Sequence, residues 1–117
     1  MAKKILVIDD DEAFVQLLNE ACAGAGYVVE FAQNGKDGLE LAKSFRPDVL
    51  LLDIMMPGMH GFEVCSTIRA DIELAHIKII IISAKGYQFD KTNAMAAGAD
   101  HYLVKPFRLP ALFALLP

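Results

Sequence analysis

Polar residues that could carry out phosphoryl chemistry stand at intervals along the chain, each at the end of an apolar run. They are Asp9, Asp10, Asp53, Ser83 and Lys105. Carboxylates, a hydroxyl and an ammonium group around one point suit a phosphoryl group, because its oxygens carry the charge that cations and hydrogen-bond donors stabilise. An aspartate can also act as the nucleophile, since aspartate forms acyl phosphates. If the fold gathers these residues, the sequence indicates transfer of a phosphoryl group.

Three clustered carboxylates would repel one another, and this repulsion predicts a metal ion. At ~4 Å and an effective dielectric constant of about 20, each pair of like charges costs on the order of 4 kcal/mol. One lysine offsets part of this cost, whereas Mg2+ bound by carboxylate oxygens, a backbone carbonyl and water offsets more. No histidine or cysteine directly follows an apolar run, which argues against zinc or copper. We therefore expect Mg2+ as the cofactor.

Each polar residue has an expected role in this site. Asp53 is the expected nucleophile, and Asp9 and Asp10 are the expected metal ligands, with a bridging water as an option for one of them. Ser83 is expected to donate a hydrogen bond to a phosphoryl oxygen. Lys105 is expected to pair with the Asp53 carboxylate before transfer and with a phosphoryl oxygen after it.

The apolar runs predict the strands that position these residues. The run from Val49 to Leu52 is continuous, as in a strand buried on both faces of a parallel sheet, and Asp53 ends it. The other expected strands are Lys4–Ile8, Tyr27–Ala32, Ile77–Ile82 and His101–Val104. Sites in open α/β sheets lie beyond the carboxyl ends of the strands, so the polar residues are expected to converge there.

Helical patterns fill the intervals between the strands. The first helix has an apolar stripe formed by Phe14, Leu17, Leu18, Ala21, Cys22 and Ala25, with Asp11 and Glu12 at its start. The remaining helices are expected from an N-cap at Asn34 to a stop at Pro47, and over Phe62–Ala70, Asp90–Ala97 and Pro110–Leu116. This alternation predicts an α/β fold with a doubly wound, five-stranded parallel sheet and helices on both faces.

Composition and charge limit the class of protein. At 117 residues the chain fits one domain, 1–117, and its 55% hydrophobic residues and mean hydropathy of +0.37 favour a folded α/β protein. The net charge of -4 argues against a surface that binds nucleic acid. Cys22 and Cys65 lack metal-ligand spacing and are expected to be buried thiols. Acidic residues interrupt the N-terminal apolar run before a signal peptide or membrane span could form, so we expect a cytoplasmic protein.

The loop after Asp53 contains two local signals. Pro57-Gly58 predicts a turn, because proline fixes φ and glycine leaves it free. His60 stands just before Gly61, and we interpret it as a residue that accommodates left-handed backbone rather than as a catalytic group.

Four segments together resemble the receiver domain of two-component response regulators, and the resemblance covers essentially the whole chain. The segments read ILVIDDDE, DVLLLDIMMPGMHGFE, IIIISAKG and HYLVKPF. The resemblance implies a flavodoxin-like (βα)5 fold with strand order 2-1-3-4-5. It also implies a phosphoacceptor switch that assists its own phosphorylation and dephosphorylation, rather than an enzyme with other substrates.

The same resemblance implies a phosphodonor and a metal site. Asp53 would be phosphorylated by a sensor histidine kinase or a phosphotransfer protein. Mg2+ would be bound by Asp10, Asp53 and the backbone carbonyl of Met55, with Asp9 assisting. The side chains of Met55 and Lys85 resemble positions that tune the lifetime of the acyl phosphate.

A conformational switch is also implied by the resemblance. Ser83 and Tyr102 would move together on phosphorylation, and the Lys105-Pro106 bond would be cis. Their movement would remodel the surface of the fourth helix, the fifth strand and the fifth helix, where an output domain or a second copy would bind. The last expected helix lacks a charged outer face, so either the chain is part of a longer protein or that end meets a partner; we favour the first.

Three alternative functions require residues that differ from those of a receiver. An unphosphorylated interaction module of the same fold would have no need of Asp10, Asp53 and Lys105. A haloacid-dehalogenase-like phosphatase would have a second aspartate two residues after the nucleophile, where Met55 stands. A flavodoxin-like flavin binder would have a phosphate-binding Ser/Thr/Gly loop after the first strand, where this chain has DDDE.

Overall fold

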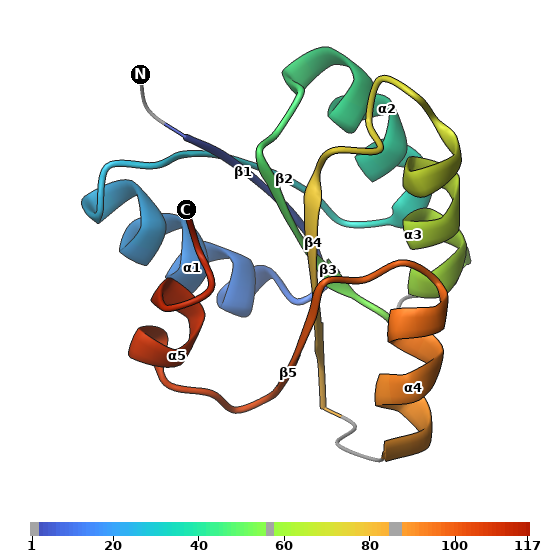
Figure 1. Ribbon diagram of the computed structural model, residues 1–117. Coiled ribbons are helices and arrows are strands. Elements are labelled where there is room, and N and C mark those ends of the chain that lie inside the picture. Colours follow the sequence, from blue (N-terminus) through green and yellow to red (C-terminus); the bar gives the residue numbers. More distant parts are fainter. Residues whose placement is uncertain (1–2, 56–57, 85–87) are drawn as a thin grey trace.

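The computed structural model describes residues 3–55, 58–84 and 88–117, in which strands and helices alternate (Figure 1). The strands are β1 (Lys4–Ile8), β2 (Val28–Ala32), β3 (Val49–Asp53), β4 (Lys78–Ser83) and β5 (His101–Val104). The helices are α1 (Glu12–Gly24), α2 (Gly35–Phe45), α3 (Gly61–Ala70), α4 (Gln88–Ala96) and α5 (Leu109–Phe113). The predicted fold class is confirmed.

The strands form one parallel sheet in the order β2-β1-β3-β4-β5, which confirms the order that the resemblance implied. The helices divide between its faces: α1 and α5 cover one face, and α2, α3 and α4 cover the other (Figure 1). β3 lies in the middle, with Ile8 of β1 beside Leu52 and Ile82 of β4 beside Asp53. The carboxyl ends of β1, β3 and β4 therefore meet at one edge.

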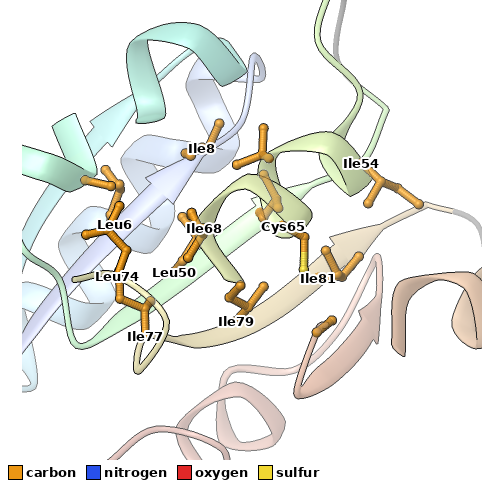
Figure 2. Close-up of a cluster of buried hydrophobic side chains, with 14 of the residues drawn as sticks. Leu6, Ile8, Leu50, Ile54, Cys65, Ile68, Leu74, Ile77, Ile79 and Ile81 are labelled. Carbon is orange, nitrogen blue, oxygen red and sulfur yellow. The ribbon is translucent and has the colours of Figure 1, made fainter. Parts of the chain in front are cut away.

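The core consists of two apolar layers, one on each face of the sheet. Alternate residues of a strand point to opposite faces, so Leu6 and Ile8 of β1 enter one layer while Ile5 and Val7 enter the other. Figure 2 shows the layer on the α2–α4 face, where Ile68 of α3 packs with the strand side chains. Burying one such aliphatic side chain contributes about 1.5–3 kcal/mol. This packing fixes the strand ends that carry the site.

The buried stripe of α1 differs from the predicted one. Val15, Leu18 and Cys22 are buried, whereas Leu17 is 55% exposed and Ala25 is exposed at the C-cap. The helix sequence has apolar residues at neighbouring positions, such as Phe14-Val15 and Leu17-Leu18. Two overlapping apolar stripes therefore fit the helical period. The sheet selects the stripe that starts at Val15, which leaves Leu17 at the surface.

The last helix is shorter and earlier than predicted: α5 is Leu109–Phe113 rather than Pro110–Leu116. Beyond Phe113 the backbone tightens, because the N–H groups of Leu115 and Leu116 donate to carbonyls three residues back. Both leucines still pack against the core layer of α1 and α5. The predicted apolar stripe is thus used, but only part of it in an α-helix.

Side-chain caps fix the starts of three helices. Asp11 accepts a hydrogen bond from the Phe14 N–H at 3.2 Å and Asn34 accepts one from the Asp37 N–H at 2.9 Å, as predicted for helix-start residues. His60 corrects our interpretation: its backbone is extended, with φ -68° and ψ 145°, rather than left-handed. Its Nδ1 accepts the Phe62 N–H at 3.0 Å, so His60 is the N-cap of α3.

Two predictions lie wholly or partly outside the described residues. The turn at Pro57-Gly58 includes Pro57, and the lifetime-tuning position includes Lys85. Within the described ranges, none of the helices has the length and apolar character needed to cross a membrane.

Candidate functional site

Three carboxylates meet where β1 and β3 end. One carboxylate oxygen from each of Asp9, Asp10 and Asp53 lies within 4.8 Å of the others. The cause is the parallel pairing of Ile8 with Leu52, which places the next residue of each strand at the same edge of the sheet. Asp9 and Asp53 are buried and Asp10 is exposed. The predicted convergence of the acidic residues is therefore present in the structure.

The loop after β3 approaches the end of that strand closely. A Cβ added to Gly61 would lie 2.6 Å from the Ile54 Cα and 2.9 Å from the Asp53 carbonyl oxygen. Backbone at this separation leaves no room for a side chain, so glycine is required at the first residue of α3. The start of α3 thus packs directly against the backbone that carries Asp53.

Asp53 is an acid whose protonated form is favoured by its surroundings. Burial is the largest cause that raises the pKa of its carboxyl group, and the charges of Asp9 and Asp10 raise the pKa further. The Met55 N–H, which donates to Asp53 Oδ1 at 3.0 Å, and the charge of Lys105 lower it in part. The net result is a raised pKa, so an added cation would stabilise the ionised form.

Lys105 is paired with Asp9, and this differs from the predicted pairing with Asp53. Its Nζ lies 2.8 Å from Asp9 Oδ2, while Asp9 Oδ1 accepts the Asp11 N–H at 2.9 Å. The Asp9 side chain is fully buried, so its carboxylate needs a counter-charge, and Lys105 supplies one. Lys105 acts on Asp53 only through the longer-range charge effect already described.

Ser83 and Tyr102 lie on neighbouring strands and point to the same face of the sheet. Ser83 of β4 pairs with Val104 of β5. The pair formed by Ile81 and Tyr102 lies two residues earlier along both strands. Paired residues share a face and residues two apart share it as well. Ser83 is buried, Tyr102 is half-buried against the α2–α4 core layer, and the Lys105 N–H donates to the Ser83 carbonyl at 2.7 Å. The two predicted switch residues are therefore diagonal neighbours on one face of the sheet.

Sequence reasoning missed two aromatic residues at this site. The Lys105 Nζ lies 4.0 Å from the centroid of the Phe14 ring, and Phe107 meets that ring at 5.9 Å and 89°. The helical spacing of Phe14 predicts only that it belongs to the apolar stripe of the first helix. The signal was available, since Phe14 is in the first turn after the acidic segment and Phe107 is two residues after Lys105.

A groove opens beside these aromatic side chains. Its volume is about 440 Å3 and its lining is formed by Phe14, Leu17, Ala84, Lys105, Pro106 and Phe107. The Lys105-Pro106 peptide bond is cis, as the resemblance implied. The groove brings apolar surface from α1 and from the β5–α5 connection next to the acidic cluster.

Known proteins that are similar to this chain belong to one family, and their similarity extends over the residues of the site. The family model for the response regulator receiver domain matches residues 5–116. Response regulator MprA of Mycolicibacterium vanbaalenii is 40% identical over 114 residues, which are 97% of this chain and 48% of that protein. The alkaline phosphatase synthesis transcriptional regulatory protein PhoP of Bacillus subtilis is 40% identical over 107 residues, 92% of this chain and 44% of PhoP. The chain thus spans about half the length of these relatives.

Solved structures with the same fold include a chemotaxis protein and a response regulator. Chemotaxis protein CheY4 of Vibrio cholerae superimposes with a TM-score of 0.92 at 32% identity, over 97% of this chain and 95% of CheY4. A response regulator from Burkholderia pseudomallei, solved with a phosphorylated aspartic acid, calcium ion and citrate, gives a TM-score of 0.90 at 26% identity, over 98% of this chain and 66% of that one.

Proposed function

The chain belongs to the response regulator receiver domain family, and on that premise we propose that Asp53 is the residue that accepts the phosphoryl group. Receivers of this family are phosphoacceptor switches of two-component systems. The observation that supports the assignment is the cluster of Asp9, Asp10 and Asp53, whose oxygens lie within 4.8 Å. Asp53 is the member of this cluster that ends the central strand β3. Lys105 pairs with Asp9, so Asp53 has no direct ion pair among the described residues.

In the proposed reaction an Asp53 carboxylate oxygen attacks the phosphorus of a phosphohistidine. The new bond joins that oxygen to phosphorus while the phosphorus–nitrogen bond breaks, and the imidazole leaves with the electron pair and takes up a proton. The Met55 N–H at 3.0 Å orients the Asp53 carboxylate for attack. Ser83 and Lys105 are proposed to stabilise the charge on the phosphoryl oxygens, for which Lys105 must leave Asp9.

A divalent cation fits the residues at this site. Asp9, Asp10 and Asp53 supply oxygen atoms within 4.8 Å, and the described residues offer one direct ammonium partner to three acids. Such an excess of hard anionic oxygens suits Mg2+. We propose Asp10, Asp53 and the Met55 carbonyl as its ligands, with Asp9 assisting. When bound, Mg2+ supplies positive charge that keeps the carboxylates ionised and neutralises the phosphoryl oxygens.

The proposed switch links the site to a binding surface. Ser83 would follow the phosphoryl group, and Tyr102, on the same face of the neighbouring strand, would move with it. The surface of α4, β5 and α5 would then change its affinity for an output domain or a second copy of the chain. We further propose a cytoplasmic sensor histidine kinase or phosphotransfer protein as the donor, and a contribution of the site to its own dephosphorylation.

Intact mass spectrometry after incubation with acetyl phosphate and Mg2+ tests this function. The wild type should gain one phosphoryl group, and Asp53→Asn should gain none. Asp48→Asn is the matched control, because Asp48 is an acid near β3 that binds the Lys4 N–H, far along the strand from the cluster. An unmodified wild type would favour an interaction module of the same fold that is not phosphorylated.

A further inference from the structure

Among the residues that the structure describes, the Lys105 ammonium contacts a carboxylate and an aromatic ring. Its Nζ lies 2.8 Å from Asp9 Oδ2 and 4.0 Å from the centroid of the Phe14 ring. The faces of aromatic rings are electron-rich and attract cations. Phe14 therefore contacts the same ammonium that Asp9 binds, and the distance is well inside the range of about 6 Å over which this attraction acts.

Neighbouring side chains keep the Phe14 ring in this orientation. Phe107 meets it at an interplanar angle of 89°, an edge-to-face arrangement that aromatic pairs prefer. The Lys105 side chain is 21% exposed, so much of its surface is removed from water. Partial removal of water strengthens the attraction between a cation and a ring. Phe14 and Phe107 thus form a packed aromatic pair beside the acidic cluster.

We propose that Phe14 is a positioning residue that holds the Lys105 ammonium on Asp9 and thereby opposes the binding of a divalent cation at the acidic cluster. The proposal rests on the proposed function, because it takes Asp9 to be part of a cation site. Both oxygens of Asp9 are engaged, Oδ1 by the Asp11 N–H and Oδ2 by Lys105. A cation that uses Asp9 must therefore compete with the lysine.

The expected size of the effect follows from linkage. The contact with Phe14 stabilises the state in which Lys105 is paired with Asp9, but not the cation-bound state. The apparent affinity for the cation therefore falls by the same factor by which the contact favours the paired state. Contacts between cations and rings at partly exposed sites correspond to about a two- to fivefold change in an equilibrium constant. Weakening the ring's attraction for the ammonium should therefore tighten Mg2+ binding by about two- to fivefold.

A purely structural role for Phe14 makes a different prediction. The ring also lines the groove with Leu17, Pro106 and Phe107, where its shape and apolar surface would suffice. Fluorine substituents on the ring preserve shape and apolar character but withdraw electrons from the ring face. A structural role predicts unchanged Mg2+ affinity along a fluorination series, whereas the positioning role predicts a graded increase.

The first experiment replaces Phe14 with mono-, di- and trifluorophenylalanine in the full chain and measures the Mg2+ dissociation constant by calorimetry. Affinity should rise stepwise, to about two- to fivefold at the end of the series. Leu17→Ala is the matched control, because Leu17 lines the same groove and is exposed. An unchanged constant across the series, or an equal change in the Leu17→Ala variant, overturns the proposal.

NMR of the lysine side chains provides a second readout that is independent of phosphorylation. The ε-methylene protons of Lys105 should be shifted upfield by the Phe14 ring, and Phe14→Leu should remove this shift. Saturating Mg2+ should also remove it, since the lysine then leaves the ring. A Lys105 signal that is unshifted in the wild type, or that keeps its shift when Mg2+ is bound, contradicts the proposal.

The two proposals can fail separately. If Mg2+ binds and responds to fluorination of Phe14 but Asp53 gains no phosphoryl group, the positioning role stands and the proposed function fails. If Asp53 is phosphorylated while fluorination leaves Mg2+ affinity unchanged, only the positioning role fails. Absence of Mg2+ binding by the wild type overturns both the positioning role and the metal site on which it rests.

Discussion

Asp9 and Lys105 form a 2.8 Å ion pair although they are 96 positions apart in the sequence. Asp9 follows β1 and Lys105 follows β5, with the ends of β3 and β4 between them in the sheet. The pair therefore spans the edge at which Asp53 and Ser83 lie. It compensates one of three clustered acids and leaves the other two for a cation.

Removing the lysine should destabilise the protein in the absence of metal. Lys105→Met leaves the fully buried Asp9 carboxylate without its counter-charge, and breaking a buried pair in this way costs about 3 kcal/mol. Urea unfolding in EDTA measures the change. Arg46→Ala is the control, since it breaks the exposed Arg46–Glu73 pair and should cost less than about 1 kcal/mol. Equal losses in both variants would show that the Asp9 pair contributes no more than a surface pair.

Asp53 should lower the stability of the metal-free protein at neutral pH. Its pKa is raised in the folded state, mainly by burial, so the folded protein binds a proton more tightly than the unfolded chain. Stability therefore falls as pH rises from the unfolded pKa near 3.8 through the folded pKa, and it stays lower above that window. Asp53→Asn should raise the melting temperature at pH 7 in EDTA.

The pH dependence of the stability gained by Asp53→Asn tests whether the gain comes from the Asp53 carboxyl group. The advantage of Asp53→Asn over wild type should shrink as the pH is lowered through the folded pKa and should vanish below the unfolded pKa near 3.8, where the wild-type carboxyl is protonated in both states. Asp9→Asn should act in the opposite direction at pH 7, because it removes the partner of Lys105. A destabilised Asp53→Asn variant at pH 7 would contradict the raised pKa.

Divalent metal should stabilise the folded chain through the acidic cluster. A ligand that binds only the folded state adds about 2.7 kcal/mol at one hundred times its dissociation constant. Thermal unfolding with and without saturating Mg2+ measures this gain. Asp10→Asn should abolish the gain while leaving metal-free stability nearly unchanged, because Asp10 is exposed. A full Mg2+ response in Asp10→Asn would place the metal elsewhere.

The N-cap of α3 offers a test away from the cluster. His60 Nδ1 accepts the Phe62 N–H, so His60→Ala should destabilise the protein by about 1 kcal/mol. His60→Asp should retain or improve stability, since aspartate is among the preferred N-caps. His76→Ala, at an exposed position in the α3–β4 connection, is the control and should have little effect in chemical denaturation. If His60→Ala behaves like His76→Ala, the cap contributes nothing.

The fold was predictable because its signals are local and repeated. Each apolar run that reads as a strand ends on a polar residue, and the parallel sheet then carries those ends to one edge. This is how Asp9, Asp10 and Asp53 could be grouped before their geometry was known. The resemblance to receiver domains implied the strand order, which alternation alone leaves open and which the structure confirms.

The remaining details depend on which side chains meet, and no periodic pattern specifies that. Lys105 is expected on Asp53 but pairs with Asp9, and both acids are buried, so neither the spacing nor the burial of the two acids specifies the partner. His60 suggested unusual backbone, yet its ring nitrogen caps a helix. Phe14 fits the helical stripe and also lies against Lys105, and only the second contact places it at the site.

Mapping the phosphorylated residue tests the proposal for Asp53 most directly. The chain is incubated with acetyl phosphate and Mg2+, the acyl phosphate is reduced with borohydride, and tandem mass spectrometry locates the resulting homoserine. We predict homoserine at position 53, with unmodified aspartate at Asp9 and Asp10. Homoserine at either of those positions, or at none, would contradict the assignment of Asp53 as the phosphoacceptor.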